Sequence, residues 1–140
     1  MNKNRNISPT LIKRLKIQGY CNLTDYELKE LNFGNRFAYI LCSIIVFIGV
    51  FTINIQLLIA MMIVALLGVS LPYHPFDYIY NHLLRYIMKK PKLPPRSKQI
   101  KFACSIATIW LATTIGLFSK GFTIAGYIVG GFLFISHSWY

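Results

Sequence analysis

The fold of this 140-residue chain is decided by residues 37–71, which read FAYILCSIIVFIGVFTINIQLLIAMMIVALLGVSL and hold no charged side chain. One helix needs about 20 apolar residues to cross the ~30 Å hydrocarbon core of a bilayer, so this stretch is long enough for two crossings. Its only polar cluster, residues 52–56, lies near the middle and contains an Asn, which favours turns. The stretch therefore predicts two helices, over residues 37–53 and 56–71, joined by a tight turn.

A second apolar block covers residues 100–140 and is broken only at Ser119-Lys120-Gly121, which predicts helices over residues 100–118 and 122–138. Neither block alternates polar and apolar residues as barrel strands do, and an open sheet would leave backbone groups unpaired in lipid. Only 14% of the residues are charged, well below the roughly one quarter of a soluble domain. The chain is thus predicted to be an all-α membrane protein with four transmembrane helices in two hairpins.

The basic residues are distributed unevenly along the chain. Of the 15 Lys and Arg residues, seven precede residue 37, seven lie within residues 73–101, one (Lys120) lies in the second turn and none lies in the first. Cytoplasmic segments of membrane proteins carry such an excess of positive charge. We therefore expect a multi-pass protein of the bacterial cytoplasmic (inner) membrane, with both termini and the central segment in the cytoplasm.

The net charge of +11 also raises the question of nucleic-acid binding. Membrane topology accounts for nearly all of this excess, so we expect no nucleic-acid partner. Each Lys or Arg near a membrane surface gains about 1 kcal/mol from anionic lipid, so anionic membrane lipids are the expected partners.

Four segments follow from this pattern. They are a cytoplasmic N-terminal segment with short helices (1–36), a first transmembrane hairpin (37–72), a cytoplasmic amphipathic helix with a Pro-rich linker (73–99) and a second transmembrane hairpin (100–140). In the first segment, Ser8-Pro9 opens one short helix, and a capping box from Thr24 to Glu27 starts another that ends near Leu31. These helices either bind the membrane surface or a cytosolic partner, or they cover the bundle.

The helix predicted over residues 75–90 is amphipathic. Its apolar positions recur at helical spacing, whereas Asp77 and Asn81 belong to the opposite, polar side. His74 suits a cap for this helix, and Asp77 suits its positive N-terminus. Such a helix lies in the membrane interface or caps the bundle. The residues that we expect to contact lipid are Phe76, Leu83, Arg85, Lys89, Lys90 and Lys92.

The two hairpins resemble each other. Cys42-Ser43-Ile44 recurs 62 residues later as Cys104-Ser105-Ile106, and each hairpin has a basic flank and a minimal outer loop. Because both hairpins enter from the cytoplasm, the repeat is predicted to be parallel, about an axis along the membrane normal.

Three short motifs support a family resemblance. Gly34-Asn35-Arg36-Phe37-Ala38, the stretch from Pro72 to Arg85, and Pro94-Pro95-Arg96 leading into Phe102-Ala103 resemble the bacterial membrane family of domain of unknown function 4395. The resemblance covers about residues 32–135. It implies four helices with an intervening amphipathic segment, and it supplies no function.

Few residues could carry chemistry. Cys42 and Cys104 are predicted at equivalent depth, either as a thiol pair that faces across the axis or as small packing residues. His74, His82, His137 and Asp77 all lie on the cytoplasmic side, but their spacing is no recognised zinc signature. We expect no metal, no cofactor and no catalytic residues, since none of the four predicted helices has a charged residue in its interior.

Small residues are also spaced for close helix packing. These small residues, which pack helices either within the monomer or against another subunit, are Ala112, Gly116, Gly126 and Gly130. The function that we expect is a non-catalytic accessory or structural subunit of a larger membrane complex, with other membrane subunits or a second copy as partners. The alternatives are a small oligomeric transporter or lipid- or quinone-binding module, and a thiol-linked membrane protein.

Overall fold

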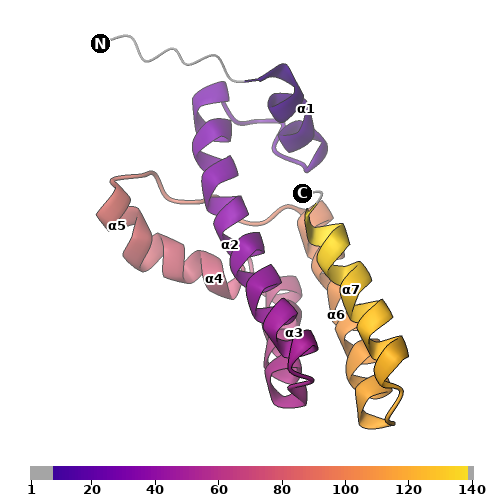
Figure 1. The fold of residues 1–140 in the computed structure, drawn as a ribbon. Helices are drawn as coiled ribbons and strands as arrows, with labels where there is room; N and C mark the ends of the chain where they lie inside the picture. The colour runs from indigo at the N-terminus through magenta and orange to yellow at the C-terminus, as the bar shows by residue number, and fades with distance from the viewer. Residues whose placement is uncertain (1–7, 139–140) are drawn as a thin grey trace.

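The computed structural model describes residues 8–138, and the side chains of residues 8–136, and in this range it is all-helical without a strand. The elements, drawn in Figure 1, are α1 (Pro9–Ile17), α2 (Asp25–Phe51), α3 (Ile55–Ser70), α4 (Pro75–Ile79), the π-helical turn η1 (Tyr80–Leu84), α5 (Arg85–Met88), α6 (Lys98–Ser119) and α7 (Thr123–Ser138). The predicted all-α class is confirmed.

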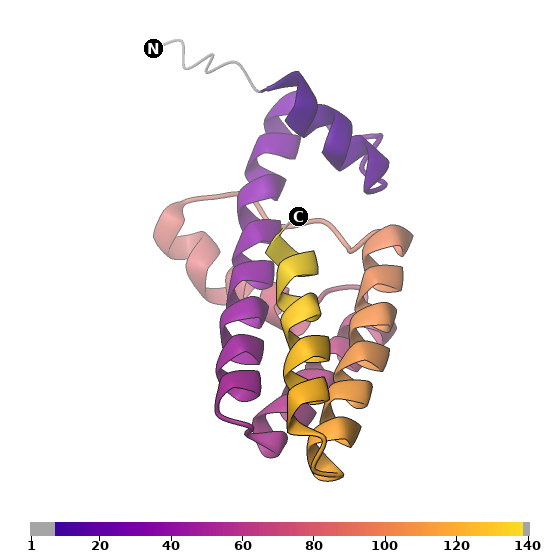
Figure 2. The ribbon, with the colours of Figure 1, turned by 45° about the vertical axis from the view of Figure 1, so that its right-hand side comes forward.

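Four helices run side by side as a bundle (Figures 1 and 2). The helix α3 packs against both α2 and α6, and α7 also packs against both, so that α2 and α6 face each other diagonally. The α2–α3 and α6–α7 turns lie together at one end, which we call the turn end. The other end, the head end, carries α1 and the arm formed by α4, η1 and α5 (Pro75–Met88) (Figure 1). Both hairpins thus point the same way.

Two helices, α2 and α6, are each long and apolar enough to cross a membrane. The helix α3 and the arm pass this test only as a pair, and they are bent by 80° where they meet. The helix α7 is apolar but shorter. Length and composition within residues 8–138 therefore support two membrane spans, or three if the bent pair is one span.

The first bundle helix begins earlier than its apolar block. Thr24 forms the predicted capping box, in which its backbone N–H donates to Glu27 Oε2 at 2.9 Å. The helix does not end near Leu31, however, and continues unbroken to Phe51. The prediction of a separate short helix was wrong because Leu31 is buried in a core with α1 and the helix continues through Gly34, against which Leu93 packs.

Two hydrophobic cores stabilise the chain. The head core joins α1, α2, the arm, the linker and the start of α6, through Leu15, Tyr20, Leu28, Leu31, Tyr80, Leu93 and Ile100. The bundle core contains Val46, Val50, Leu58, Met61, Leu111, Phe118 and Leu133. Leu15 of α1 is only 3% exposed, so the N-terminal helix packs into the head core against α2.

The predicted small packing residues fall into two groups. A Cβ atom at Gly126 would lie 2.5 Å from the Phe118 ring, and one at Gly130 would lie 2.9 Å from Val50, so both glycines permit close helix contacts inside the bundle. Ala112 and Gly116, by contrast, lie on the exposed face of α6, and a Cβ atom at Gly116 would meet nothing within 4 Å.

The predicted 62-residue repeat does not superpose the hairpins. The helices α2 and α6 end at Phe51 and Ser119, which are 68 residues apart. Cys42 therefore lies nine residues from its turn, whereas Cys104 lies fifteen residues from its own. At ~1.5 Å per residue this is a difference of roughly 9 Å in distance from the helix end, which the predicted 62-residue repeat does not account for.

Candidate functional site: a cavity at the head end

The sharp bend after α3 is fixed by a helix cap. His74 is the N-cap of α4, and its Nδ1 accepts a hydrogen bond from the Phe76 backbone N–H at 3.3 Å, as the sequence predicted. Asp77 completes the cap, because its Oδ2 accepts from the His74 backbone N–H at 3.1 Å. The arm consequently leaves α3 at a steep angle, passes α2 and extends away from the bundle (Figure 1).

The arm turns its polar side inward. Asp77 and Asn81 are 1% and 5% exposed, whereas Leu83 and Ile87 are 58% and 70% exposed. Apolar side chains can face lipid in a membrane protein, and buried polar groups need partners inside the protein. Of the residues expected to contact lipid, Phe76 instead packs against the bundle core, while Leu83 points away from it.

The buried partner of Asp77 is Arg96, from the linker between the arm and α6. The guanidinium donates from Nε to Asp77 Oδ2 and from Nη2 to Asp77 Oδ1, both at 2.5 Å. The two side chains are only 3% and 1% exposed. Burial alone would lower the pKa of Arg96, but its bonds to Asp77 outweigh this and raise the pKa, so the pair is ionised. From the sequence, Arg96 was counted as a topology charge and as part of a family motif, but not as a site residue.

Two further contacts hold the linker in place. Asn81 Oδ1 accepts from the Leu93 backbone N–H at 2.9 Å, and the Arg96 backbone N–H donates to the Pro72 carbonyl at 2.8 Å. The Leu93 side chain packs where Gly34 has no side chain, since a Cβ atom there would lie 2.4 Å from Leu93. These contacts fix the extended Pro-rich linker, so Arg96 is held in one position at the head end of the bundle.

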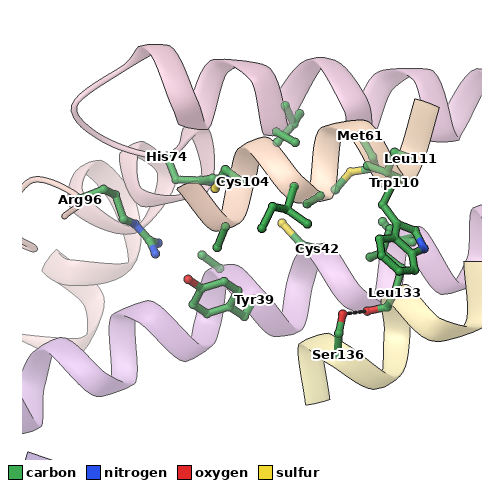
Figure 3. A pocket seen from close by; sticks show the side chains of 17 residues that line it. Tyr39, Cys42, Met61, His74, Arg96, Cys104, Trp110, Leu111, Leu133 and Ser136 are labelled. Atoms are coloured by element: carbon green, nitrogen blue, oxygen red, sulfur yellow. Dashed lines mark hydrogen bonds between the residues drawn. The ribbon is translucent and has the colours of Figure 1, made fainter. Parts of the chain in front are cut away.

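Beside this ion pair lies a partly open cavity of about 210 Å³ lined by residues of α2, α3, α6 and α7, which we call the central cavity (Figure 3). Its polar end contains Arg96, His74 and Tyr39, and the Arg96 guanidinium carbon lies 5.6 Å from the centre of the Tyr39 ring. Its wall is otherwise mostly apolar, and includes Val46, Met61, Ala65, Ala107, Trp110 and Leu133.

His74 adds no charge to this site at neutral pH. Burial and then the neighbouring Arg96 lower the pKa of His74 to about 4, and Asp77 offsets this only in part. Because its Nδ1 accepts a hydrogen bond, the neutral ring carries its proton on Nε2. The polar end of the central cavity therefore combines one cation, one anion and one neutral imidazole.

Both candidate thiols line the central cavity (Figure 3). They are free, and they belong to the diagonal helices α2 and α6. Cys104 packs next to α3, because a Cβ atom at Gly68 would lie 3.4 Å from its Sγ and 2.7 Å from the His74 ring. Cys42 and Cys104 thus share one cavity without forming a disulfide. Within the described residues, which exclude the His137 side chain, no group of three His, Cys, Asp or Glu residues could hold a metal ion.

The basic residues expected at the membrane surface lie on and after the arm. Lys90 pairs with Glu30 at 3.0 Å, and Lys92 lies 5.5 Å from the centre of the Tyr73 ring. Lys89 is exposed and ends α5 in a left-handed conformation, and Arg85 stacks on the Tyr86 ring. The arm therefore carries basic groups beside the exposed apolar face of Leu83 and Ile87.

The fold and cavity can now be placed among known proteins. A family model described as "Domain of unknown function (DUF4395)" matches residues 33–138. The chain belongs to the DUF4395 family. The match begins within α2 and covers the bundle, the arm and the linker, so the central cavity is built wholly from the DUF4395 region. No curated protein and no solved structure matches the chain.

Proposed function

We propose that this DUF4395 protein crosses the bacterial cytoplasmic membrane four times, with both termini in the cytoplasm. The support is the positive charge at the head end, where residues 1–36 and 73–101 contribute 14 of the 15 basic residues and the turn end holds only Lys120. Single-cysteine labelling tests this arrangement: Asn54→Cys and Lys120→Cys react from outside intact cells, whereas Lys16→Cys and Lys92→Cys react only after permeabilisation. A Lys92→Cys variant that reacts from outside contradicts the topology.

Within that membrane, we propose that the protein is a non-catalytic module that holds a small membrane-soluble molecule in the central cavity. The observation that carries this function is the cavity itself, a partly open, mostly apolar space of about 210 Å³ with Arg96 and His74 at its polar end. An engineered cavity of ~150 Å³ stays dry and binds benzene, so this space is large enough for a one- or two-ring group. Small-molecule sites typically combine such an apolar wall with a few placed polar groups.

Two substitutions on α3 test ligand binding. Ala65 lines the cavity and Ala60 is exposed on the same helix, so Ala65→Phe fills the space while Ala60→Phe is its matched control. After purification from bacterial membranes, we expect solvent extraction to release about one equivalent of a membrane-soluble compound from the wild type and the control, and much less from Ala65→Phe. Equal amounts from all three proteins contradict the proposal.

A second role, as an accessory subunit of a membrane complex, is favoured by the exposed face of α6. Ala112 and Gly116 leave room there for the close approach of another helix. Gly116→Leu should then reduce the amount of partner protein, or of a second copy, that is recovered with the chain from native membranes. Unchanged recovery contradicts this role and leaves ligand binding untouched.

A further inference from the structure

The Arg96 guanidinium has hydrogen-bond donors to spare at the polar end of the central cavity. It carries five N–H groups, of which the bonds to Asp77 use one on Nε and one on Nη2. Arg96 also lines the cavity, and Figure 3 shows its guanidinium directed between His74 and Tyr39. A donor that faces an apolar cavity gains from an acceptor placed there, so the site favours a ligand that brings oxygen atoms to this end.

The charge at this end selects among such ligands. Arg96 and Asp77 cancel, and His74 is neutral at pH 7 because burial lowers its pKa to about 4. An anionic group would therefore add an uncompensated charge to a buried site, which is costly. The oxygen atoms should accordingly belong to a neutral group, such as a carbonyl, rather than to a phosphate or carboxylate.

The wall of the cavity selects for shape. Apolar side chains from all four bundle helices line a partly open space of about 210 Å³, and the Trp110 ring contributes to its far end (Figure 3). A saturated acyl chain would fit this wall but would leave the Arg96 donors without an acceptor. A flat ring that carries carbonyl groups meets both requirements.

We propose that the central cavity binds the ring of a membrane quinone, with Arg96 donating to a ring carbonyl. This inference rests on the proposed function, since it names the class of molecule that the cavity holds. No covalent or redox step is part of it.

The test uses the fluorescence of Trp110 in the purified protein. Trp139, the second of the two tryptophans, is replaced by Phe, so that Trp110 is the single reporter. Decylubiquinone is the probe, and 1-bromodecane, a quencher without a carbonyl, is the apolar comparison. We expect saturable quenching by decylubiquinone that is weakened at least ten-fold by Ala65→Phe and is unchanged by Ala60→Phe.

Arg96→Lys tests the role of the guanidinium, since it keeps the charge beside Asp77 but removes the forked donors. It should weaken decylubiquinone binding about ten-fold without a change in the response to 1-bromodecane, and circular dichroism confirms that the variant is folded. Should Arg96→Lys fail to fold, the comparison of Ala65→Phe with Ala60→Phe decides alone.

The possible outcomes separate the two proposals. If 1-bromodecane shows saturable quenching that depends on Ala65 and decylubiquinone does not, the quinone inference is wrong and the proposed function stands. If neither quencher distinguishes Ala65→Phe from Ala60→Phe, both are wrong.

Discussion

The two ends of the bundle are packed by different means. At the turn end, glycines let helices touch, as where Phe118 lies over Gly126 and Val50 over Gly130. At the head end, the ionised pair of Asp77 and Arg96 lies beside a cavity. Apolar side chains fill the turn end. At the head end the directional ion pair positions the linker, and space remains between the helices. The difference suggests that binding belongs to the head end and rigidity to the turn end.

The largest effect should come from breaking the ion pair. Asp77→Ala leaves the Arg96 charge buried and unpaired, which costs about 3–5 kcal/mol of the free energy of unfolding. Replacing both members, as Asp77→Leu with Arg96→Met, should recover more than half of that loss. Thermal unfolding in detergent measures both variants. A double variant no more stable than Asp77→Ala would show that the cap on His74, and not the pair, is what matters.

Overpacking the turn end should cost less. Gly126→Ala places a Cβ atom 2.5 Å from the Phe118 ring, and such strain typically costs about 1–3 kcal/mol. The matched control is Gly116→Ala on α6, which meets nothing within 4 Å and gains up to about 1 kcal/mol from helix propensity. Denaturation of both variants checks the sign of each effect. Equal effects at the two glycines would contradict the tight packing of the turn end.

The free energy of unfolding should depend on pH through His74 at the head end. The pKa of His74 is about 4 in the folded protein, against 6.5 for an unperturbed histidine. Between these two pH values His74 is therefore protonated in the unfolded chain and neutral in the folded protein. Stability should therefore fall as the pH drops from 6.5 towards 4, by up to about 2 kcal/mol at pH 5. His74→Asn keeps a capping side chain and should remove this dependence. A wild-type unfolding temperature with the same pH profile as His74→Asn would rule out the buried neutral imidazole.

The smallest effect on folding should come from the outer face of the arm. Leu83 is 58% exposed, so Leu83→Glu should change the free energy of unfolding in detergent by no more than about 0.5 kcal/mol. In nanodiscs of anionic lipid the same variant should be destabilised, because its carboxylate replaces an apolar contact with the membrane. Phe76→Ala, in the bundle core, should be destabilised in both media. Loss of stability of Leu83→Glu in detergent would contradict the outward orientation of the arm.

The sequence predicted α3, α6 and α7 to within two residues because polar turns separate them from their neighbours. Asn54, expected in the first turn, caps α3, and Ser119-Lys120-Gly121 separates α6 from α7. The sequence also placed His74 as a cap and linked the chain to its family. It could not reveal that α2 continues through Leu31, because that continuity comes from burial against α1.

The candidate site was missed for a related reason. Asp77 and Arg96 are 19 residues apart, and their pairing depends on a bend and a linker that no periodicity encodes. The sequence placed Asp77 and Asn81 on the polar side of the arm and predicted that Leu83 contacts lipid, but the helical spacing does not specify which side faces the bundle where lipid can cover the other. The one sequence feature that pointed to this site was Pro94-Pro95-Arg96. Two consecutive prolines form a rigid segment, and such a segment can fix the position of the charge that follows it.

The unequal helix lengths of the bundle have a consequence for the host membrane. The helices α3 and α7 have 16 residues each, about 24 Å at ~1.5 Å per residue, while α2 and α6 have 27 and 22. Each short helix lies between two long ones. If a short helix spans a ~30 Å hydrocarbon core, the bilayer beside it must become thinner to match its length. A bilayer of shorter acyl chains is therefore the less strained host, and the protein would collect wherever the membrane is locally thin.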